Sequence, residues 1–223
     1  MVTRSARLWV GVFILFLGGC ASTPQTRTVL DASSEHLPRH TELAEVPFFA
    51  QEDYQCGPAA LAMALDAAGI KTTPEALVPE VYLPGRQGSL QVEMLAASRR
   101  YGVIAYQLAP DLRDLIAEVA AGTPVIVLQN LALSWYPVWH YAVVIGYDLD
   151  HAEIILRSGR ERLQVLPMTT FEHTWRRGGY WAMVALPPVK IPGSAEEVSF
   201  VSAVSALEKT GYPQRAQTAY LAA

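Results

Sequence analysis

One cysteine, one distant histidine and one nearby glutamine are the residues whose types and spacing could perform chemistry. Cys56 opens the apolar stretch CGPAALAMALDAA, typical of a buried helix that ends before Gly69. A sulfur in the first turn of a helix meets unpaired backbone N–H groups and the positive end of the helix dipole, and both favour the thiolate. We therefore expect Cys56 to have a lowered pKa and to act as a nucleophile. A small, buried core cysteine is the structural alternative.

Two further side chains would complete a nucleophilic site. His140 begins the apolar stretch HYAVVIGY, and the fold would have to bring its imidazole to the sulfur as a general base. Gln51 precedes Cys56 and could donate a hydrogen bond from its amide to an oxyanion. His151 and His173 are expected to be solvated, because they stand in a turn and in a charged segment.

The strands after His140 determine which residue could orient its ring. A hairpin would place Ser158 beside His140, whereas Asp148 and Asp150 would lie at the opposite end of the strands, roughly 25 Å away at about 3.3 Å per residue. No carboxylate is therefore expected beside the imidazole. Ser158, a backbone carbonyl, or Asn130 from the neighbouring strand could orient it more weakly, and a Cys–His pair can act without a third group.

The elements that must position these residues follow an α+β order, with helical patterns first and strand patterns second. Helices are expected at 56–68, after an N-cap at Thr73, at 89–101 with Ser89 as its cap, and at 111–121. Strands are expected at 124–128, 140–147, 153–157, 163–166 and 180–186, and they would form an antiparallel sheet.

Two groups of large side chains near these elements have no fixed role from sequence. The aromatic residues before His140 could wall a peptide-binding cleft or pack a long loop, and these residues are Trp135, Tyr136 and Trp139. Five arginines of the second half are expected to form solvated faces, namely Arg157, Arg160, Arg162, Arg176 and Arg177.

The N-terminus has the pattern of an export signal. Residues 1–19 combine Arg4 and Arg7 with an apolar run and small residues before Cys20. This ending resembles the lipobox of bacterial lipoproteins, which implies a lipid on Cys20, and Ala21 fits sorting to the outer membrane. We expect an exported lipoprotein on the periplasmic face of the outer membrane, with residues 20–44 as its tether. Cys56 would then be the remaining thiol in an oxidising compartment.

The folded part is expected to consist of one domain and a short appendage. Residues 45–188 form the domain, and residues 195–223 are predicted to form a helical hairpin. The spacing of Gly211, Ala216, Tyr220 and Ala223 fits a tetratricopeptide unit, although an ordinary hairpin fits equally well. We expect either that the hairpin packs on the domain or that the natural protein continues beyond Ala223, and a protein partner could bind through the hairpin.

Composition excludes several classes of function. The chain has 223 residues, is 51% hydrophobic and carries a formal net charge of -4, which argues against a nucleic-acid partner. The sequence contains no Gly-rich phosphate loop and no metal-ligand spacing, so we expect no cofactor and no metal.

The two motifs together resemble a known family. The block Gln-x4-Cys-Gly-Pro-Ala-Ala-Leu-x-Met, followed later by His-Tyr-x-Val-Val-x-Gly-Tyr-Asp, resembles the bacteriocin-processing, double-glycine-leader cysteine peptidases. It looks closest to their stand-alone lipoprotein relatives with tetratricopeptide repeats. The resemblance implies a papain-like fold, a peptide or protein substrate, Cys56 and His140 as catalytic residues, and Gln51 as the oxyanion donor. Where that family has an Asp after the histidine, this sequence has Ser158 or its neighbour.

Three functions are compatible with these observations. The first is a lipid-anchored papain-like cysteine peptidase of the periplasm. The second is a peptidase-like lipoprotein with a weak or inactive site that serves as a protein-binding module, which the missing carboxylate favours and the retained Cys, His and Gln disfavour. The third is an amidase or acyltransferase that uses the same Cys–His pair.

Overall fold

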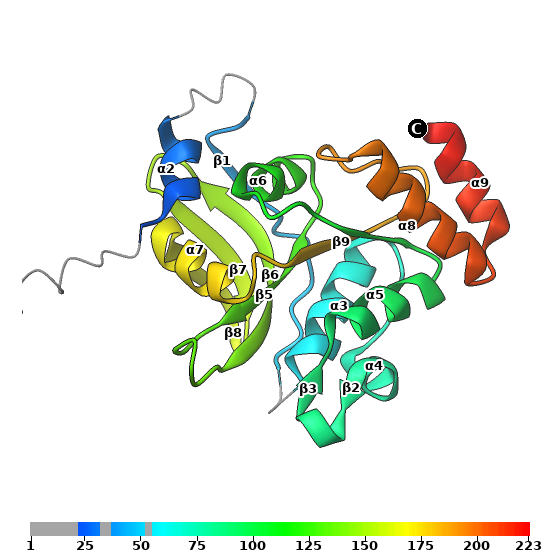
Figure 1. The fold of residues 1–223 in the computed structure, drawn as a ribbon, viewed down its shortest axis with the longest axis horizontal. Helices are drawn as coiled ribbons and strands as arrows, with labels where there is room; N and C mark the ends of the chain where they lie inside the picture. Colours follow the sequence, from blue (N-terminus) through cyan, green and yellow to red (C-terminus); the bar gives the residue numbers. More distant parts are fainter. Residues whose placement is uncertain (1–21, 32–36, 52–54) are drawn as a thin grey trace, which may run out of the picture.

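A seven-stranded antiparallel sheet runs through the structure, a computed structural model that describes residues 22–31, 37–51 and 55–223 (Figure 1). The strand order is β4-β9-β5-β6-β7-β8, and β1 shares one edge of β6 with β5. The strands are β1 (His40–Glu42), β4 (Ile104–Gln107), β5 (Val125–Asn130), β6 (Trp139–Asp148), β7 (Glu153–Ser158), β8 (Glu161–Pro167) and β9 (Ala182–Leu186). The predicted α+β class and antiparallel sheet are confirmed.

Helices cover both faces of this sheet (Figure 1). One layer contains α3 (Cys56–Ala67), α4 (Pro74–Val81) and α5 (Gln91–Arg100). The other contains α2 (Pro24–Asp31), α6 (Leu112–Ala120) and α7 (Met168–Arg177). Between α4 and α5 the chain forms a small hairpin of β2 (Tyr82–Leu83), the 3-10 helix η1 (Pro84–Arg86) and β3 (Gly88–Ser89).

Alternation along the strands divides the interior into two hydrophobic cores. In β6, Ala142 and Val144 point into the core beneath α6 and α7, whereas Tyr141, Val143 and Ile145 point into the core beneath α3. Successive side chains of a strand point to opposite faces, so a central strand covered on both sides must be apolar throughout. This explains why HYAVVIGY reads as a continuous apolar run.

The helix that begins at Cys56 is the most completely buried of the described helices. Residues 57–65 of α3 are all buried, which agrees with the predicted helix and its small side chains. A Cβ added at Gly57 would collide with the side chain of Ser89. Glycine at this position therefore allows the first turn of α3 to approach β3 closely, and this packing fixes where the thiol lies.

The segment expected to be a tether is partly folded onto the domain. Within 20–44, helix α2 buries Thr26 and Val29, and strand β1 pairs with β6. The Glu172 carboxylate accepts hydrogen bonds from the backbone N–H groups of Gln25 at 3.2 Å and Thr26 at 2.6 Å. The composition of residues 20–44 resembles that of a linker, and the acceptor that stabilises α2 lies far away in the sequence, on α7. The local sequence therefore did not predict this helix.

The predicted export signal and lipidation site lie outside the described residues. Residues 1–19, Cys20 and Ala21 belong to this part of the chain, so their predicted roles stay predictions. Among the helices that the structure describes, none has the length and apolar character that crossing a membrane requires.

Some predicted boundaries are confirmed and others are wrong. The Thr73 side chain caps α4 by accepting from the Ala76 N–H, as predicted. Ser89 does not cap the next helix, because it pairs with Tyr82 in the β2–β3 hairpin and α5 starts at Gln91. Helix α7 and strand β4 were not predicted.

The C-terminal hairpin consists of α8 (Glu197–Lys209) and α9 (Pro213–Ala222), and it packs on the domain beside α5 and β4 (Figure 1). Phe200 is buried against Tyr106, with ring centroids 6.5 Å apart. The Tyr212 hydroxyl donates to the Arg100 carbonyl at 2.6 Å, and Arg215 donates to the Gly102 carbonyl at 2.9 Å. The predicted helical hairpin is confirmed, whereas its relation to tetratricopeptide repeats stays a prediction.

Candidate active site

Cys56, His140 and Gln51 line one pocket of about 1100 Å³. Its walls come from the first turn of α3, the β2–β3 hairpin, the β5–β6 loop, the β7–β8 turn and the C-terminal end of α7. The structure therefore brings the three residues singled out by sequence to one cavity from two separate parts of the chain.

Gln51 and Cys56 both contact the backbone at the start of β6, next to His140. The Gln51 backbone N–H donates to the Gly159 carbonyl at 2.9 Å, and the Gln51 side-chain amide donates to the Tyr141 carbonyl at 3.3 Å. The Tyr141 backbone N–H faces the Cys56 sulfur. Since Tyr141 follows His140 directly, the thiol lies against the peptide unit that carries the imidazole.

The environment of the thiol differs from the expectation. Burial raises the pKa of Cys56, and the backbone N–H groups of Tyr141, Gly57 and Cys56 itself oppose that rise without cancelling it. The prediction of a lowered pKa is wrong because the partial burial of Cys56 beside the pocket raises the pKa by more than the N–H groups at the start of α3 lower it. The resting site therefore holds a neutral thiol.

The imidazole of His140 is oriented by Ser158. The His140 Nε2 atom lies 2.9 Å from the Ser158 Oγ atom. Val144 pairs with Leu156 and Val143 with Arg157, so continuing this register places Ser158 on the same face as His140 and diagonal to it. This contact leaves the Nδ1 atom of His140 without a hydrogen-bond partner among the described residues.

Burial also sets the charge of this imidazole. It lowers the pKa of His140 to about 4. The ring is therefore neutral at pH 7 and able to accept a proton. The pocket is therefore lined by a neutral thiol and a neutral imidazole.

The other residues considered for the ring have different roles. Asn130 Oδ1 accepts from the backbone N–H groups of Ala132 and Val138, both at 3.0 Å, and so closes the β5–β6 loop. Asp148 lies at the far end of β6 and accepts from exposed His151 at 2.9 Å. The described residues thus give His140 a hydroxyl partner, as the strand register predicts.

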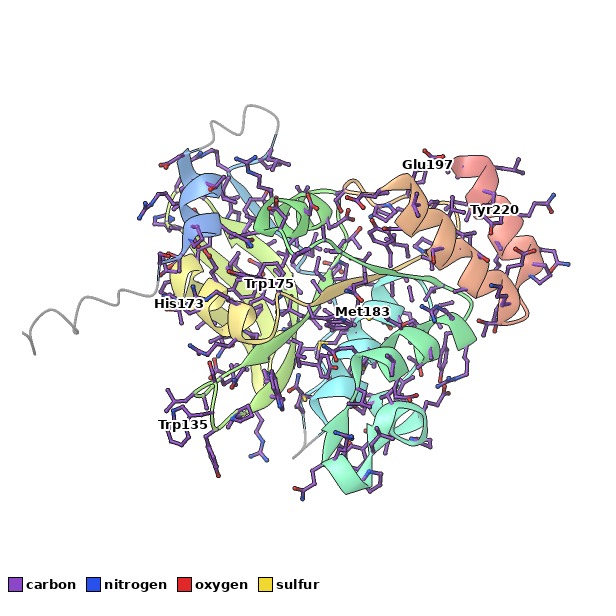
Figure 2. All side chains as sticks on the ribbon, viewed as in Figure 1. Trp135, His173, Trp175, Met183, Glu197 and Tyr220 are labelled. Carbon is purple, nitrogen blue, oxygen red and sulfur yellow. The ribbon has the colours of Figure 1, made fainter. Side chains whose placement is uncertain are left out.

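The aromatic residues of the β5–β6 loop are mostly exposed. Tyr136 and Trp139 line the pocket with 69% and 55% of their surfaces exposed, which favours a wall over loop packing. Trp135 is 79% exposed and points outward at the loop tip, away from the sheet (Figure 2).

Sequence reasoning missed the arginines of the pocket. Arg86, Arg160 and Arg177 line it; Arg160 is exposed, as predicted, whereas Arg177 is partly buried. Arg157 is only 2% exposed, because its guanidinium donates to the carbonyls of Arg162, Ala44 and Val46. The position of Arg160 could have been predicted, since the same hairpin turn carries Ser158.

Comparisons with known proteins agree with this fold. A protein described as a C39-like peptidase from Bacillus anthracis is 20% identical, with a TM-score of 0.55, over 66% of this chain and 97% of that one. The peptidase domain of Streptococcus ComA, a bi-functional ABC transporter of a quorum-sensing pathway, is 19% identical, with a TM-score of 0.52, over 64% and 99%. A double-glycine motif protease solved with a leader peptide is 22% identical, with a TM-score of 0.48, over 64% and 91%. The first two structures show that the fold is the papain-like fold of the C39 peptidases.

The sequence itself also matches a family. No curated protein matched the chain. The profile of the Peptidase_C39 like family matches residues 43–183, a range that contains Gln51, Cys56, His140 and Ser158. This match and the shared fold support a cysteine-peptidase type of hydrolase in general. The chain belongs to the Peptidase_C39 like family.

Proposed function

We propose that this protein is a cysteine peptidase that hydrolyses peptide bonds with Cys56 as the nucleophile and His140 as the general base. The observation that carries the proposal is the shared pocket, in which the Cys56 sulfur lies against the Tyr141 N–H and the preceding residue, His140, is held by Ser158. A thiol and an oriented imidazole in one cavity are the minimum for acyl transfer through a thioester.

In the first half of the reaction, a bond forms between the Cys56 sulfur and the carbonyl carbon of the substrate. The thiol proton passes to the imidazole of His140, which then protonates the leaving amine as the C–N bond breaks. In the second half, His140 takes a proton from water as the water oxygen bonds to the thioester carbon. The C–S bond then breaks, the carboxylic acid product leaves, and the imidazolium returns its proton to the Cys56 sulfur.

Gln51 and the Cys56 backbone supply the donors for the oxyanion in this proposal. A primary amide carries two N–H groups, and the Tyr141 carbonyl accepts from the Gln51 side-chain amide, which fixes its orientation. One N–H of Gln51 then remains for the oxyanion, together with the Cys56 backbone N–H. Such preorganised donors stabilise the transition state more than the substrate.

Replacing Cys56 by Ala provides the direct test. Peptides prepared from a whole proteome would be incubated with the wild-type protein, with Cys56→Ala and with His140→Gln, and new peptide termini would be counted by mass spectrometry. We expect new termini with the wild type alone, while circular dichroism shows that all three proteins are folded. Equal numbers of new termini with Cys56→Ala would remove the proposed nucleophile.

The proposed place of action is the periplasmic face of the outer membrane, with a lipid on Cys20 as the anchor. The sequence pattern of residues 1–21 supports this part of the proposal. Metabolic labelling with an alkyne fatty acid would test it, since a Cys20→Ser variant should lose both the label and its membrane association. A labelled Cys20→Ser variant would argue against this anchor.

A further inference from the structure

In the part of the chain that the structure describes, which leaves out Glu52 and Asp53, the charged side chains that line the pocket around Cys56 are all arginines. Arg86, Arg160 and Arg177 line it, and its lining contains no Asp or Glu within the part of the chain that the structure describes. None of the three arginines forms an ion pair with a carboxylate in that part. The protein as a whole has a formal net charge of -4, whereas the charged side chains in the described lining of this pocket are all positive.

These arginines come from three different walls. Arg86 ends η1 in the β2–β3 hairpin, and Arg160 follows Gly159 in the turn from β7 to β8. Arg177 ends α7, and its Nε atom donates to the Asn130 carbonyl at 3.1 Å. That bond holds Arg177 at the side of β5, while its terminal nitrogens remain free for a ligand among the described residues.

Their placement surrounds the reacting groups. The Gly159 carbonyl, next to Arg160, accepts from the Gln51 backbone N–H, so this arginine adjoins the proposed oxyanion donor. Arg86 lies in the β2–β3 hairpin, whose Ser89 packs against the first turn of α3, and Arg177 is bonded to the Asn130 carbonyl at the end of β5. A peptide bound across Cys56 in this pocket would therefore meet arginines from three separate segments of its lining.

Arginine binds carboxylates through paired N–H donors, and a concave wall concentrates the field of its charges. We propose that the substrate of this site is an acidic peptide segment, with Asp or Glu side chains close to the bond that is cleaved. This inference rests on the proposed peptidase function and names the substrate class of the same pocket. It concerns the charge of the substrate and not the identity of the nucleophile.

Matched peptides test the proposal on the full chain. A cleaved sequence found with the wild-type protein would be resynthesised with Glu, Gln or Lys at the positions that flank the scissile bond. We expect kcat/KM to follow the order Glu, Gln, Lys, with a difference of about two- to fivefold for each arginine engaged by a carboxylate. The preference should shrink in 1 M salt, where the screening length falls to about 3 Å.

Substitution of the arginines connects the preference to the pocket. The triple variant of Arg86, Arg160 and Arg177 to Gln should bring the Glu-to-Gln ratio of kcat/KM close to one. Arg113→Gln is the matched control, because Arg113 is exposed on α6 and lines no part of this pocket. Arg113→Gln removes one positive charge, as each of the three pocket substitutions does. It should leave the Glu-to-Gln ratio of kcat/KM as in the wild type.

A binding measurement separates this inference from the proposed function. Fluorescence anisotropy with Cys56→Ala would compare labelled Glu and Lys peptides without any cleavage, and we expect tighter binding of the Glu peptide. Cleavage of all three peptides at equal rates, with equal binding, would overturn the acidic-substrate proposal and leave the peptidase proposal standing. Selective binding of the Glu peptide without cleavage by the wild type would support the charge preference and count against the peptidase proposal.

Discussion

The His140 Nε2 atom lies 2.9 Å from the Ser158 Oγ atom. A hydroxyl can fix the orientation and tautomer of a ring, but it brings no charge that would stabilise an imidazolium. The site therefore combines an oriented base with low basicity, because burial already lowers the pKa of His140 to about 4. Changing this single partner should change the basicity without moving the ring.

Ser158→Asp would place a carboxylate beside His140. An adjacent negative charge favours the protonated ring, so the pKa of His140 should rise by about one unit or more. The acid limb of the kcat/KM profile should move to higher pH with it. Histidine ring NMR measures the first effect, and the pH–rate profile measures the second.

Ser158→Ala is the matched control, since it removes the hydrogen bond without adding charge. We expect a pKa that stays low and a kcat reduced about two- to tenfold, the effect of one neutral hydrogen bond. An Asp variant whose ring titrates as in the wild type would contradict the contact between these two side chains.

The reactivity of Cys56 should reflect its burial. With Cys20 replaced by Ser, Cys56 is the only thiol in the chain, and its alkylation by iodoacetamide can be followed against pH. Because burial raises the pKa of Cys56, the midpoint in the folded protein should lie above that of the same protein in urea. A midpoint lower in the folded protein would mean that the α3 N-terminus outweighs burial.

The low pKa of His140 should make stability depend on pH. The pKa in the folded protein is about 4 against 6.5 for an ordinary histidine, so the unfolded chain binds the extra proton between these values. Stability should be complete above pH 6.5 and fall towards pH 4, by roughly 3 kcal/mol for this group. Urea unfolding of the wild type and of His140→Gln at several pH values measures the free energy of unfolding against pH. Identical pH dependence of the two proteins between pH 6.5 and pH 4 would refute the prediction.

The buried carboxylate of Glu172 should stabilise the N-terminal helix α2. Glu172→Gln removes the charge that faces the N–H groups of Gln25 and Thr26, and we expect a loss of about 1 to 3 kcal/mol. Amide hydrogen exchange of residues 24–31 should quicken. Glu161→Gln, at an exposed position, is the control, and equal effects of both variants would argue against the role of Glu172.

The C-terminal hairpin should contribute to the stability of the domain on which it packs. Phe200 is 3% exposed and Val198, on the same helix, is 83% exposed. Phe200→Ala should therefore cost about 3 to 5 kcal/mol of unfolding free energy, and Val198→Ala less than about 0.5 kcal/mol. Urea titration compares them. A small effect at Phe200 would mean that the hairpin is held mainly by its polar contacts.

Local patterns predicted the parts of the fold that local physics controls. The small apolar residues after Cys56 and the apolar run after His140 identified α3 and β6, and the hairpin register placed Ser158 correctly. Helix α7 also had a signal, since Met168, Phe171 and Trp175 are spaced for one buried face. The other residues of α7 are mostly polar or charged, and they made that spacing hard to recognise.

The missed features depend on contacts between distant segments. Arg157 looks like a surface charge until the carbonyls of Ala44 and Val46 are brought to it. The pKa of Cys56 depends on how deeply the start of α3 is packed, and the helix pattern does not contain that information. Likewise, no local pattern indicates that Glu172 would cap a helix formed near the N-terminus.

The docking of α2 has a consequence for how a lipid on Cys20 would hold the protein. The Ser22 carbonyl accepts from Arg176 at 3.0 Å, so the folded body begins two positions after that cysteine. Two residues extend at most about 7 Å, so a lipid on Cys20 would hold the folded part close to the bilayer. Under the proposed lipid anchor, the dimensions of the folded part, and not a long flexible linker, would limit the distance between the Cys56 sulfur and the bilayer. The proposed peptidase would then act on chains that come within that distance of the membrane surface.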